Sequence, residues 1–174
     1  RLFKGSNPMS PTPTPAYAIL FVCTGNICRS PTAHGVLLAQ LERAGLAGRV
    51  AVDSAGTHGY HTGEPPDERS QAHAARRGYD LSGLRARPVM VGDFKQYDLI
   101  LAMDGGHLEL LTGRCPPELR SRLQRFTAWC QQPAPRDVPD PYYGGAQGFE
   151  HVLDLVEDGC AGLLQHVQAR LQPS

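Results

Sequence analysis

Four short segments rich in apolar residues alternate along the chain with segments whose apolar residues recur every three or four positions. The short segments lie at residues 17–22, 50–55, 98–103 and 123–126. The continuous apolar runs at 18–22 and 99–103 predict strands that are covered on both faces, as in parallel sheets. The most regular helical spacing is near the C-terminus, in Phe149, Val152, Val156, Cys160, Leu163, Val167 and Leu171. Strands alternating with helices predict an α/β fold whose parallel sheet has right-handed crossovers.

The first predicted helix covers residues 32–44 and follows the first strand after a short polar turn. Ser30 is a candidate for its N-cap, and Pro31 suits the first helical position, where a missing N–H costs nothing. Gly45 is placed where a helix commonly ends. The sequence therefore predicts a strand, a tight turn and a helix N-terminus in direct succession.

Further along the chain, Asp67 or one of its neighbours can cap a helix that runs to about residue 77, and Asp104 can cap one that runs to about residue 111. Residues 84–91 indicate a short extended piece. Glycine and proline mark residues 56–66 and 133–145 as loops.

The composition is ordinary for a globular protein, with 41% hydrophobic and 20% charged residues, and predicts one domain over residues 17–174. Lys+Arg and Asp+Glu both number 17, so charge does not favour a nucleic-acid or membrane partner. Residues 1–16 are rich in Pro, Thr and Ser and predict a disordered tail. We expect residues 1–8, which precede Met9, to derive from an expression vector. Five scattered cysteines indicate a reducing cytoplasm rather than a disulfide framework.

The turn after the first strand carries the chemistry, within the sequence VCTGNICRSP at residues 22–31. Unpaired N–H groups and the helix dipole make a strand–turn–helix junction a site for anions. Cys23 and Arg29 form a C-x5-R pattern, in which a thiolate attacks a bound oxyanion that a planar guanidinium grips. Gly25 permits close backbone approach, Asn26 can pin the loop, and the Ser30 hydroxyl can stabilise the thiolate. A lone cysteine at a strand end favours a structural role, but the whole combination favours catalysis.

Displacement of a phenolate leaving group requires a proton donor, and Asp140 is the candidate. It lies between Pro139 and Pro141, in a loop that can fold back over the turn. A turn aspartate before proline is also common without any catalytic role, so spacing alone leaves both interpretations open.

The chain resembles the low-molecular-weight protein tyrosine phosphatases from about residue 19 to residue 164. The resemblance rests on VCTGNICRSP at 22–31, DSAGT at 53–57, YH at 60–61, GEP at 63–65, YDLILAMD at 97–104 and DPYY at 140–143. It implies a flavodoxin-like four-stranded parallel sheet with helices on both faces. It also implies a phosphocysteine on Cys23, phosphate binding by Arg29 and general acid and base catalysis by Asp140, with no metal or other cofactor.

The same resemblance assigns residues to substrate binding. These are Thr24, Gly25, Asn26, Ile27, Cys28 and Ser30 in the turn, and the cleft tyrosines Tyr60, Tyr142 and Tyr143. For each tyrosine, packing or a place at the solvent edge is the alternative. Cys28 matches a second cysteine that some members oxidise to a protective disulfide with the nucleophile, and a small buried thiol is the alternative.

Three other functions compete with phosphotyrosine hydrolysis. Arsenate reductases of this fold need two more relay cysteines, and Cys115, Cys130 and Cys160 are too far apart in the sequence. Arginine phosphatases of the family resemble this chain but carry threonine at the position of Ile27 and lack the Tyr-Tyr pair. A phosphate- or phosphopeptide-binding module without catalysis would lack Cys23 or Asp140, and both are present.

The chain departs from the family pattern at one place. Many members carry Asn after Met-Asp, whereas this chain has Gly105, Gly106 and His107, which leaves the contacts there open.

The last helix resembles bacterial members, some of which act on tyrosine kinases of polysaccharide export. We therefore expect phosphotyrosine proteins, including such a kinase, as partners, and phosphate or another oxyanion in the site. We further expect a monomer or weak dimer in the cytoplasm, or a secreted effector.

Overall fold

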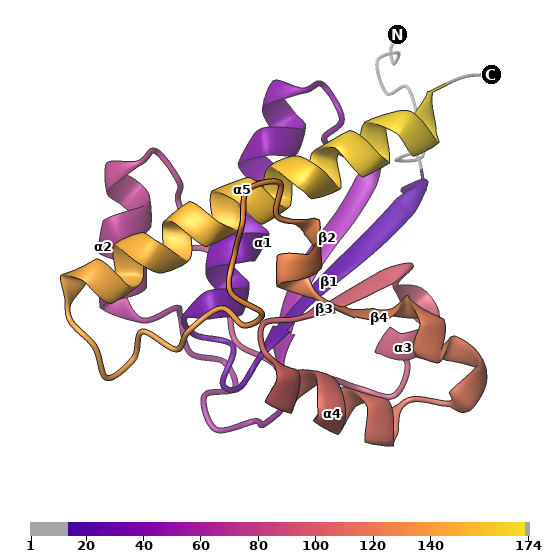
Figure 1. The fold of residues 1–174 in the computed structure, drawn as a ribbon, viewed down its shortest axis with the longest axis horizontal. Helices are drawn as coiled ribbons and strands as arrows, with labels where there is room; N and C mark the ends of the chain where they lie inside the picture. The colour runs from indigo at the N-terminus through magenta and orange to yellow at the C-terminus, as the bar shows by residue number, and fades with distance from the viewer. Residues whose placement is uncertain (1–13, 173–174) are drawn as a thin grey trace, which may run out of the picture.

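The computed structural model describes residues 14–172 and is built on one four-stranded parallel sheet in the order β2-β1-β3-β4 (Figure 1). The strands are β1 (Tyr17–Cys23), β2 (Val50–Gly56), β3 (Leu99–Ala102) and β4 (Leu123–Arg125). In the register, Phe21 of β1 lies opposite Ser54 of β2 and Leu101 of β3. Strand β1 lies between two parallel neighbours and ends at Cys23. Cys23 is therefore at the carboxyl edge of the strands, where such sheets bind ligands.

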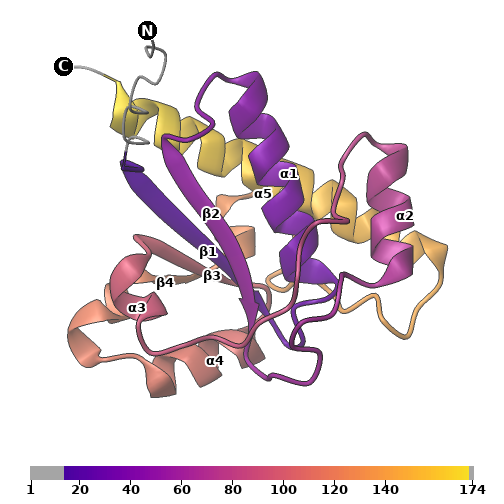
Figure 2. The same ribbon diagram turned by 180° about the vertical axis from the view of Figure 1, so that it is seen from behind.

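Helices cover both faces of the sheet, as the sequence predicted (Figures 1 and 2). They are α1 (Arg29–Arg43), α2 (Glu68–Arg76), α3 (Asp93–Gln96), α4 (Gly105–Arg114) and α5 (Ala146–Leu171), with the 3-10 helices η2 (Pro117–Arg122) and η3 (Phe126–Trp129). The two layers have separate cores. Ile19 and Phe21 pack in the core of α1 and α5, whereas Leu20 and Val22 pack in the core of α3 and α4. Successive residues of a strand point to opposite faces, which is why β1 is apolar throughout.

The predicted start of the first helix was wrong. Helix α1 begins at Arg29 rather than residue 32, its N-cap position is Cys28, and no side chain caps it. Ser30 lies inside the helix because its hydroxyl is used elsewhere, 3.0 Å from the Cys23 sulfur. By contrast, Asp67 and Asp104 cap α2 and α4 by accepting hydrogen bonds from backbone N–H groups, as predicted.

One further expectation is met only in part. The predicted extended piece at residues 84–91 forms a single bridge between Gly56 and Pro88 rather than a strand. The predicted disordered tail is described only at residues 14–16 and stays a prediction, and the segment that we expect to derive from a vector lies outside the described residues. Within residues 14–172, none of the helices is both long and apolar enough to cross a bilayer.

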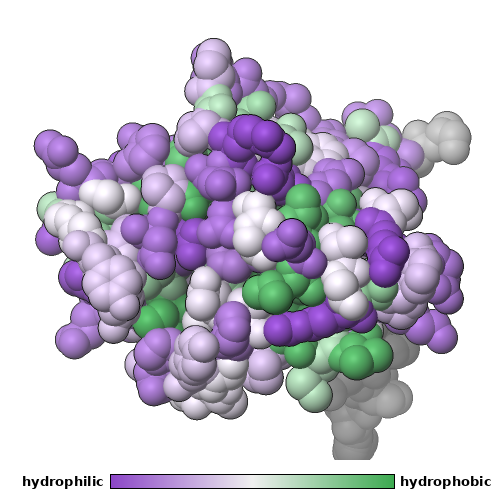
Figure 3. All heavy atoms as spheres, turned by 60° about the horizontal axis from the view of Figure 1, so that its bottom comes forward, coloured by the Kyte–Doolittle hydropathy of each residue, from purple (hydrophilic) through white to green (hydrophobic). Residues whose placement is uncertain are grey.

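One face of the molecule shows hydrophobic side chains in patches among hydrophilic ones (Figure 3), and several large hydrophobic side chains are exposed. Among residues 14–172 the exposed ones are Leu38, Tyr60, Met90, Val91, Leu110, Tyr142 and Tyr143. The three tyrosines in this set all line a single cavity.

Close packing of α5 against η3 leads to a first prediction. A Cβ atom on Gly162 would lie 2.0 Å from the carbonyl oxygen of Trp129, closer than any contact permits. We expect Gly162→Ala to lower the free energy of unfolding, measured with urea, by about 1–3 kcal/mol. The matched control is Gly113→Ala in α4, whose Cβ meets nothing within 4 Å. There we expect a gain of about 0.5–1 kcal/mol, and equal effects at both positions would contradict the packing argument.

Candidate active site

The candidate site is the loop of residues 24–28, which joins β1 to α1 and is called the anion loop below. Cys23 is the last residue of β1 and Arg29 is the first residue of α1, so the two ends of the C-x5-R pattern are fixed by regular structure. The two residues that follow β2 hold the start of the loop, because Thr57 N–H donates to Cys23 O at 2.8 Å and His58 N–H donates to Thr24 O at 3.0 Å.

The backbone N–H groups of residues 24–28 have no acceptor within the described chain. These donors lie at the N-terminus of α1, where the helix dipole adds positive potential. Free N–H groups that converge beside a helix start form a concave site for a tetrahedral anion.

Asn26 gives the loop its shape. It has a left-handed backbone conformation, with φ at 60°, which asparagine tolerates better than most residues. Its side-chain amide donates to Ser30 Oγ at 2.8 Å and accepts from Arg87 N–H at 3.0 Å. The strained residue is therefore fixed by α1 on one side and by the segment before α3 on the other.

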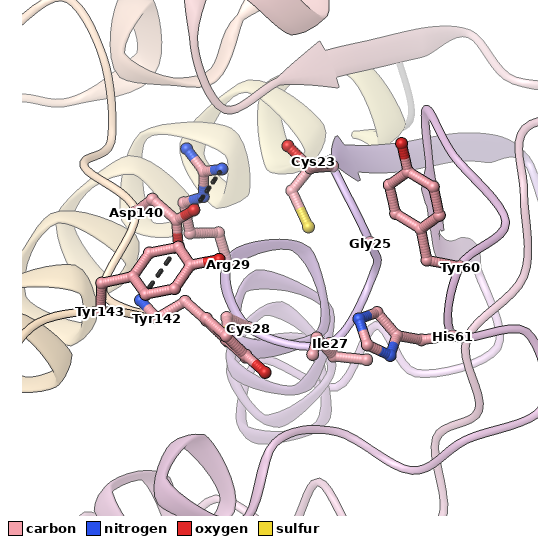
Figure 4. Close-up of a pocket in the computed structure, with 11 residues that line it drawn as sticks. Cys23, Gly25, Ile27, Cys28, Arg29, Tyr60, His61, Asp140, Tyr142 and Tyr143 are labelled. Carbon is pink, nitrogen blue, oxygen red and sulfur yellow. Dashed lines mark hydrogen bonds and ion pairs between the residues drawn. The ribbon is translucent and has the colours of Figure 1, made fainter.

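The two cysteines of the site have different surroundings. The Cys23 sulfur is 3.0 Å from Ser30 Oγ and points into the space between the labelled side chains in Figure 4. Ser30 Oγ accepts from Asn26, and its proton has two acceptors within reach, the Cys23 sulfur at 3.0 Å and Ala55 O at 3.5 Å, so the hydroxyl can donate to a thiolate at the nearer position. Burial raises the pKa of Cys28 to about 12, so that side chain is a neutral thiol near pH 7. The surroundings thus favour Cys23 as the nucleophile, and both cysteines are free thiols.

Arg29 is buried, and its guanidinium is fixed by two acceptors from outside the loop. Nη1 donates to Asp104 Oδ2 and to Val138 O, each at 2.9 Å. Burial opposes ionisation of Asp104, but the hydrogen bond from His107 N–H and the hydrogen bond and charge of Arg29 outweigh it and lower the pKa of this carboxyl. A carboxylate therefore holds one side of the guanidinium fork and leaves the other side toward the cavity.

Asp140 comes from the loop before α5 and lies beside Arg29. Its Oδ2 is 3.8 Å from Arg29 Nη2, and its other oxygen accepts from Tyr142 N–H at 3.0 Å (Figure 4). The side chain is 48% exposed, so it has access to both the cavity and water. The loop is anchored at Val138, whose N–H donates to Met103 O at 2.8 Å.

A cavity of about 250 Å³ opens over the anion loop. It is lined by Cys23, Thr24, Gly25, Ile27, Cys28, Arg29, Tyr60, His61, Asp140, Tyr142 and Tyr143. Tyr60 forms one wall and stacks on His58, with ring centroids 4.9 Å apart. Tyr142 and Tyr143 form the opposite wall in an edge-to-face pair with centroids 5.0 Å apart. A polar floor between aromatic walls suits a flat ring that carries an anion.

The structure brings the predicted site residues together with two exceptions in placement. Asn26 and Ser30 do not line the cavity but support the loop from behind. Sequence reasoning missed His61, whose ring packs on Gly25, and His107, whose ring is 2.7 Å from Thr24 Oγ1. The sequence contained one signal for His107, the departure from the family pattern after Met103. That departure did not indicate which residue His107 would contact. Within residues 14–172, no group of three or more His, Cys, Asp or Glu side chains is arranged to hold a metal ion.

Comparison with known proteins agrees with this geometry. Residues 18–173 match the family described as low molecular weight phosphotyrosine protein phosphatase. A low molecular weight protein-tyrosine-phosphatase of Streptomyces coelicolor is 45% identical over 159 residues, which cover 90% of this chain and 96% of the relative.

Solved structures agree in fold as well as sequence. A protein tyrosine phosphatase from Entamoeba histolytica, with Hepes in its active site, matches with a TM-score of 0.85 and 38% identity, covering 90% of this chain and 99% of that one. Vibrio vulnificus Wzb in complex with benzylphosphonate matches with a TM-score of 0.75 and 32% identity, covering 87% and 99%. The chain therefore belongs to the low molecular weight phosphotyrosine protein phosphatases and is a hydrolase of that family.

Proposed function

We propose that the protein hydrolyses phosphotyrosine in proteins through a phosphocysteine on Cys23. The observation that carries the proposal is that Cys23, Arg29 and four of the five anion-loop residues, whose backbone N–H groups have no acceptor in the described chain, line one cavity with tyrosine walls. All three suit a phosphoryl group, and the walls suit the ring that bears it.

In the first step the phosphoryl group binds to the N–H groups and to the free side of the Arg29 fork. The Cys23 thiolate attacks phosphorus, an S–P bond forms, and the bond between phosphorus and the phenolic oxygen breaks. Asp140 gives its proton to the departing oxygen, so tyrosine leaves as a neutral phenol. Charge that develops on the phosphoryl oxygens is stabilised by donors already in place.

In the second step water replaces the phenol beside Asp140. The carboxylate takes one proton from this water as its oxygen attacks phosphorus, and the S–P bond breaks. Inorganic phosphate leaves, the sulfur returns as a thiolate, and Asp140 is protonated again. The Ser30 hydroxyl, 3.0 Å from the sulfur, donates to the thiolate in both steps.

Two relatives support an oxyanion with an organic group attached as the ligand. The Entamoeba histolytica phosphatase holds Hepes in its active site, and Vibrio vulnificus Wzb is in complex with benzylphosphonate. Benzylphosphonate joins an aromatic ring to a tetrahedral anion, and we expect the Tyr60 and Tyr142 walls to receive the ring and the anion loop to receive the anion.

The arsenate reductase alternative is disfavoured by the remaining cysteines. Cys115, Cys130 and Cys160 do not line the cavity, and each thiol lies near a backbone carbonyl instead. Burial raises the pKa of Cys130 to about 11 and that of Cys160 well above its usual value. A disulfide relay needs thiolates that can reach the nucleophile, and these surroundings disfavour them.

We expect Cys23→Ser to abolish turnover of aryl phosphates, lowering kcat by about 10⁴-fold or more, because an alcohol replaces the thiolate. Binding of vanadate or phosphate should persist, since the N–H groups and Arg29 remain. Steady-state kinetics and calorimetric binding measure the two properties separately. Cys28→Ser is the matched control and should retain turnover, and turnover near the native rate in Cys23→Ser would exclude Cys23 as the nucleophile.

Asp140→Asn should lower kcat on phosphotyrosine peptides by about 10²- to 10³-fold, because the phenolate then leaves without a proton. The loss should be smaller on aryl phosphates with acidic leaving groups, which need less protonation. The matched control is Asp137→Asn, a neighbouring exposed acid that accepts from Gly105 N–H and retains an acceptor oxygen as the amide. Equal losses on both substrates would exclude a general-acid role for Asp140.

The arginine phosphatase alternative is tested by substrate choice. Ile27 presents an apolar side chain to the cavity, which suits an aromatic ring better than a guanidinium leaving group. We expect kcat/KM on a phosphotyrosine peptide to exceed that on the matching phosphoarginine peptide by at least about tenfold. Ile27→Thr should reduce this ratio, and a preference of the native protein for phosphoarginine would overturn the proposal.

A further inference from the structure

The first turn of α4 lies against the outer side of the anion loop (Figures 1 and 2). His107, in this turn, is only 4% exposed and does not line the cavity. Its Nε2 is 2.7 Å from the hydroxyl oxygen of Thr24, the residue directly after the nucleophile. A buried imidazole is thus connected to the start of the loop without touching a substrate.

The tautomer of this ring follows from its other nitrogen. Nδ1 is 3.2 Å from Asp104 Oδ1, although the two are not aligned as a hydrogen bond. A lone pair on Nδ1 would face a carboxylate oxygen at short range, so the proton belongs on Nδ1. Nε2 then accepts the proton of the Thr24 hydroxyl, which fixes the rotamer of that side chain.

Asp104 extends the same contacts to the other end of the loop. One of its oxygens accepts from His107 N–H at 2.9 Å, and the other accepts from Arg29 Nη1 at 2.9 Å. Thr24, the first residue of the loop, and Arg29, the residue that follows the loop, are therefore both fixed to a single helical turn.

The arrangement needs a neutral imidazole, because a cation there would compete with Arg29 for Asp104. Burial and the Arg29 charge lower the pKa of His107 to about 4, so the ring is neutral near pH 7. A neutral ring can accept from Thr24, whereas a protonated ring cannot.

We propose that His107 is a positioning residue that acts through Thr24 and Asp104 to set the spacing between the nucleophile end and the arginine end of the anion loop. The inference rests on the proposed phosphatase chemistry. A transition state with charge on all phosphoryl oxygens is sensitive to this spacing, since small misplacements of catalytic groups are costly in rate.

The experiment separates the hydrogen bond from simple packing. His107→Leu retains an apolar side chain of similar bulk, whereas His107→Gln places an amide near the position of Nε2. Thr24→Val removes the hydroxyl but not the shape, and Thr24→Ser retains the hydroxyl. Glu109→Gln, on the exposed side of the same helix, is the matched control.

For each variant we would measure kcat per active site, from the burst of phenol release, together with the vanadate inhibition constant and the melting temperature. We expect His107→Leu and Thr24→Val each to lower kcat and weaken vanadate inhibition by about tenfold. The double variant should lose little more than either single one, because both remove one interaction. His107→Gln, Thr24→Ser and Glu109→Gln should stay within about threefold of the native protein.

Two outcomes would overturn the inference. One is a lower melting temperature in His107→Leu with kcat per active site within twofold of native, which would indicate packing alone. The other is additive losses in the double variant, which would indicate independent roles. If the native protein itself lacks aryl phosphate turnover, the proposed function fails instead, so the two failures are distinguishable.

Discussion

The rest of the site depends on the hydrogen bonds that compensate the buried charge of the Arg29 guanidinium. A charge taken out of water is stable only if it is paired and hydrogen-bonded. Asp104 and the Val138 carbonyl supply that compensation, and both act on the same nitrogen. The pairing therefore satisfies the charge without occupying the side of the fork that faces the cavity, and Arg29 stays available to an anionic ligand.

This requirement explains why distant segments meet at the carboxyl end of β1. Asp104 follows β3, Val138 belongs to the loop before α5, and Arg87, which fixes Asn26, precedes α3. Each contributes one contact to a loop whose own backbone donors have no acceptor in the described chain. An unsatisfied loop of this kind does not hold its shape alone, so its geometry depends on the sheet and on both helical layers.

Much of the fold was predictable because β1 carries apolar residues on both faces and α5 repeats them at helical spacing. The candidate site was also predictable in outline, since Cys23, Arg29 and Asp140 belong to compact motifs. The start of α1 was not, because Ser30 satisfies the usual rule for a cap while its hydroxyl contacts the Cys23 sulfur. A local rule fails there because a tertiary contact competes for the same oxygen.

The sequence by itself determined the order of strands and helices, the anion loop and the chemical character of its residues, because these follow from local pattern and residue type. Only the tertiary structure decided the partners: Asp104 for Arg29, Arg87 for Asn26 and His107 for Thr24. The two residues of each pair are more than sixty positions apart in the sequence. The pattern of residue types along a chain does not show which distant groups will form a hydrogen bond. The physical reason is that a hydrogen bond is specified by atomic distance and direction, which exist only once the sheet has assembled.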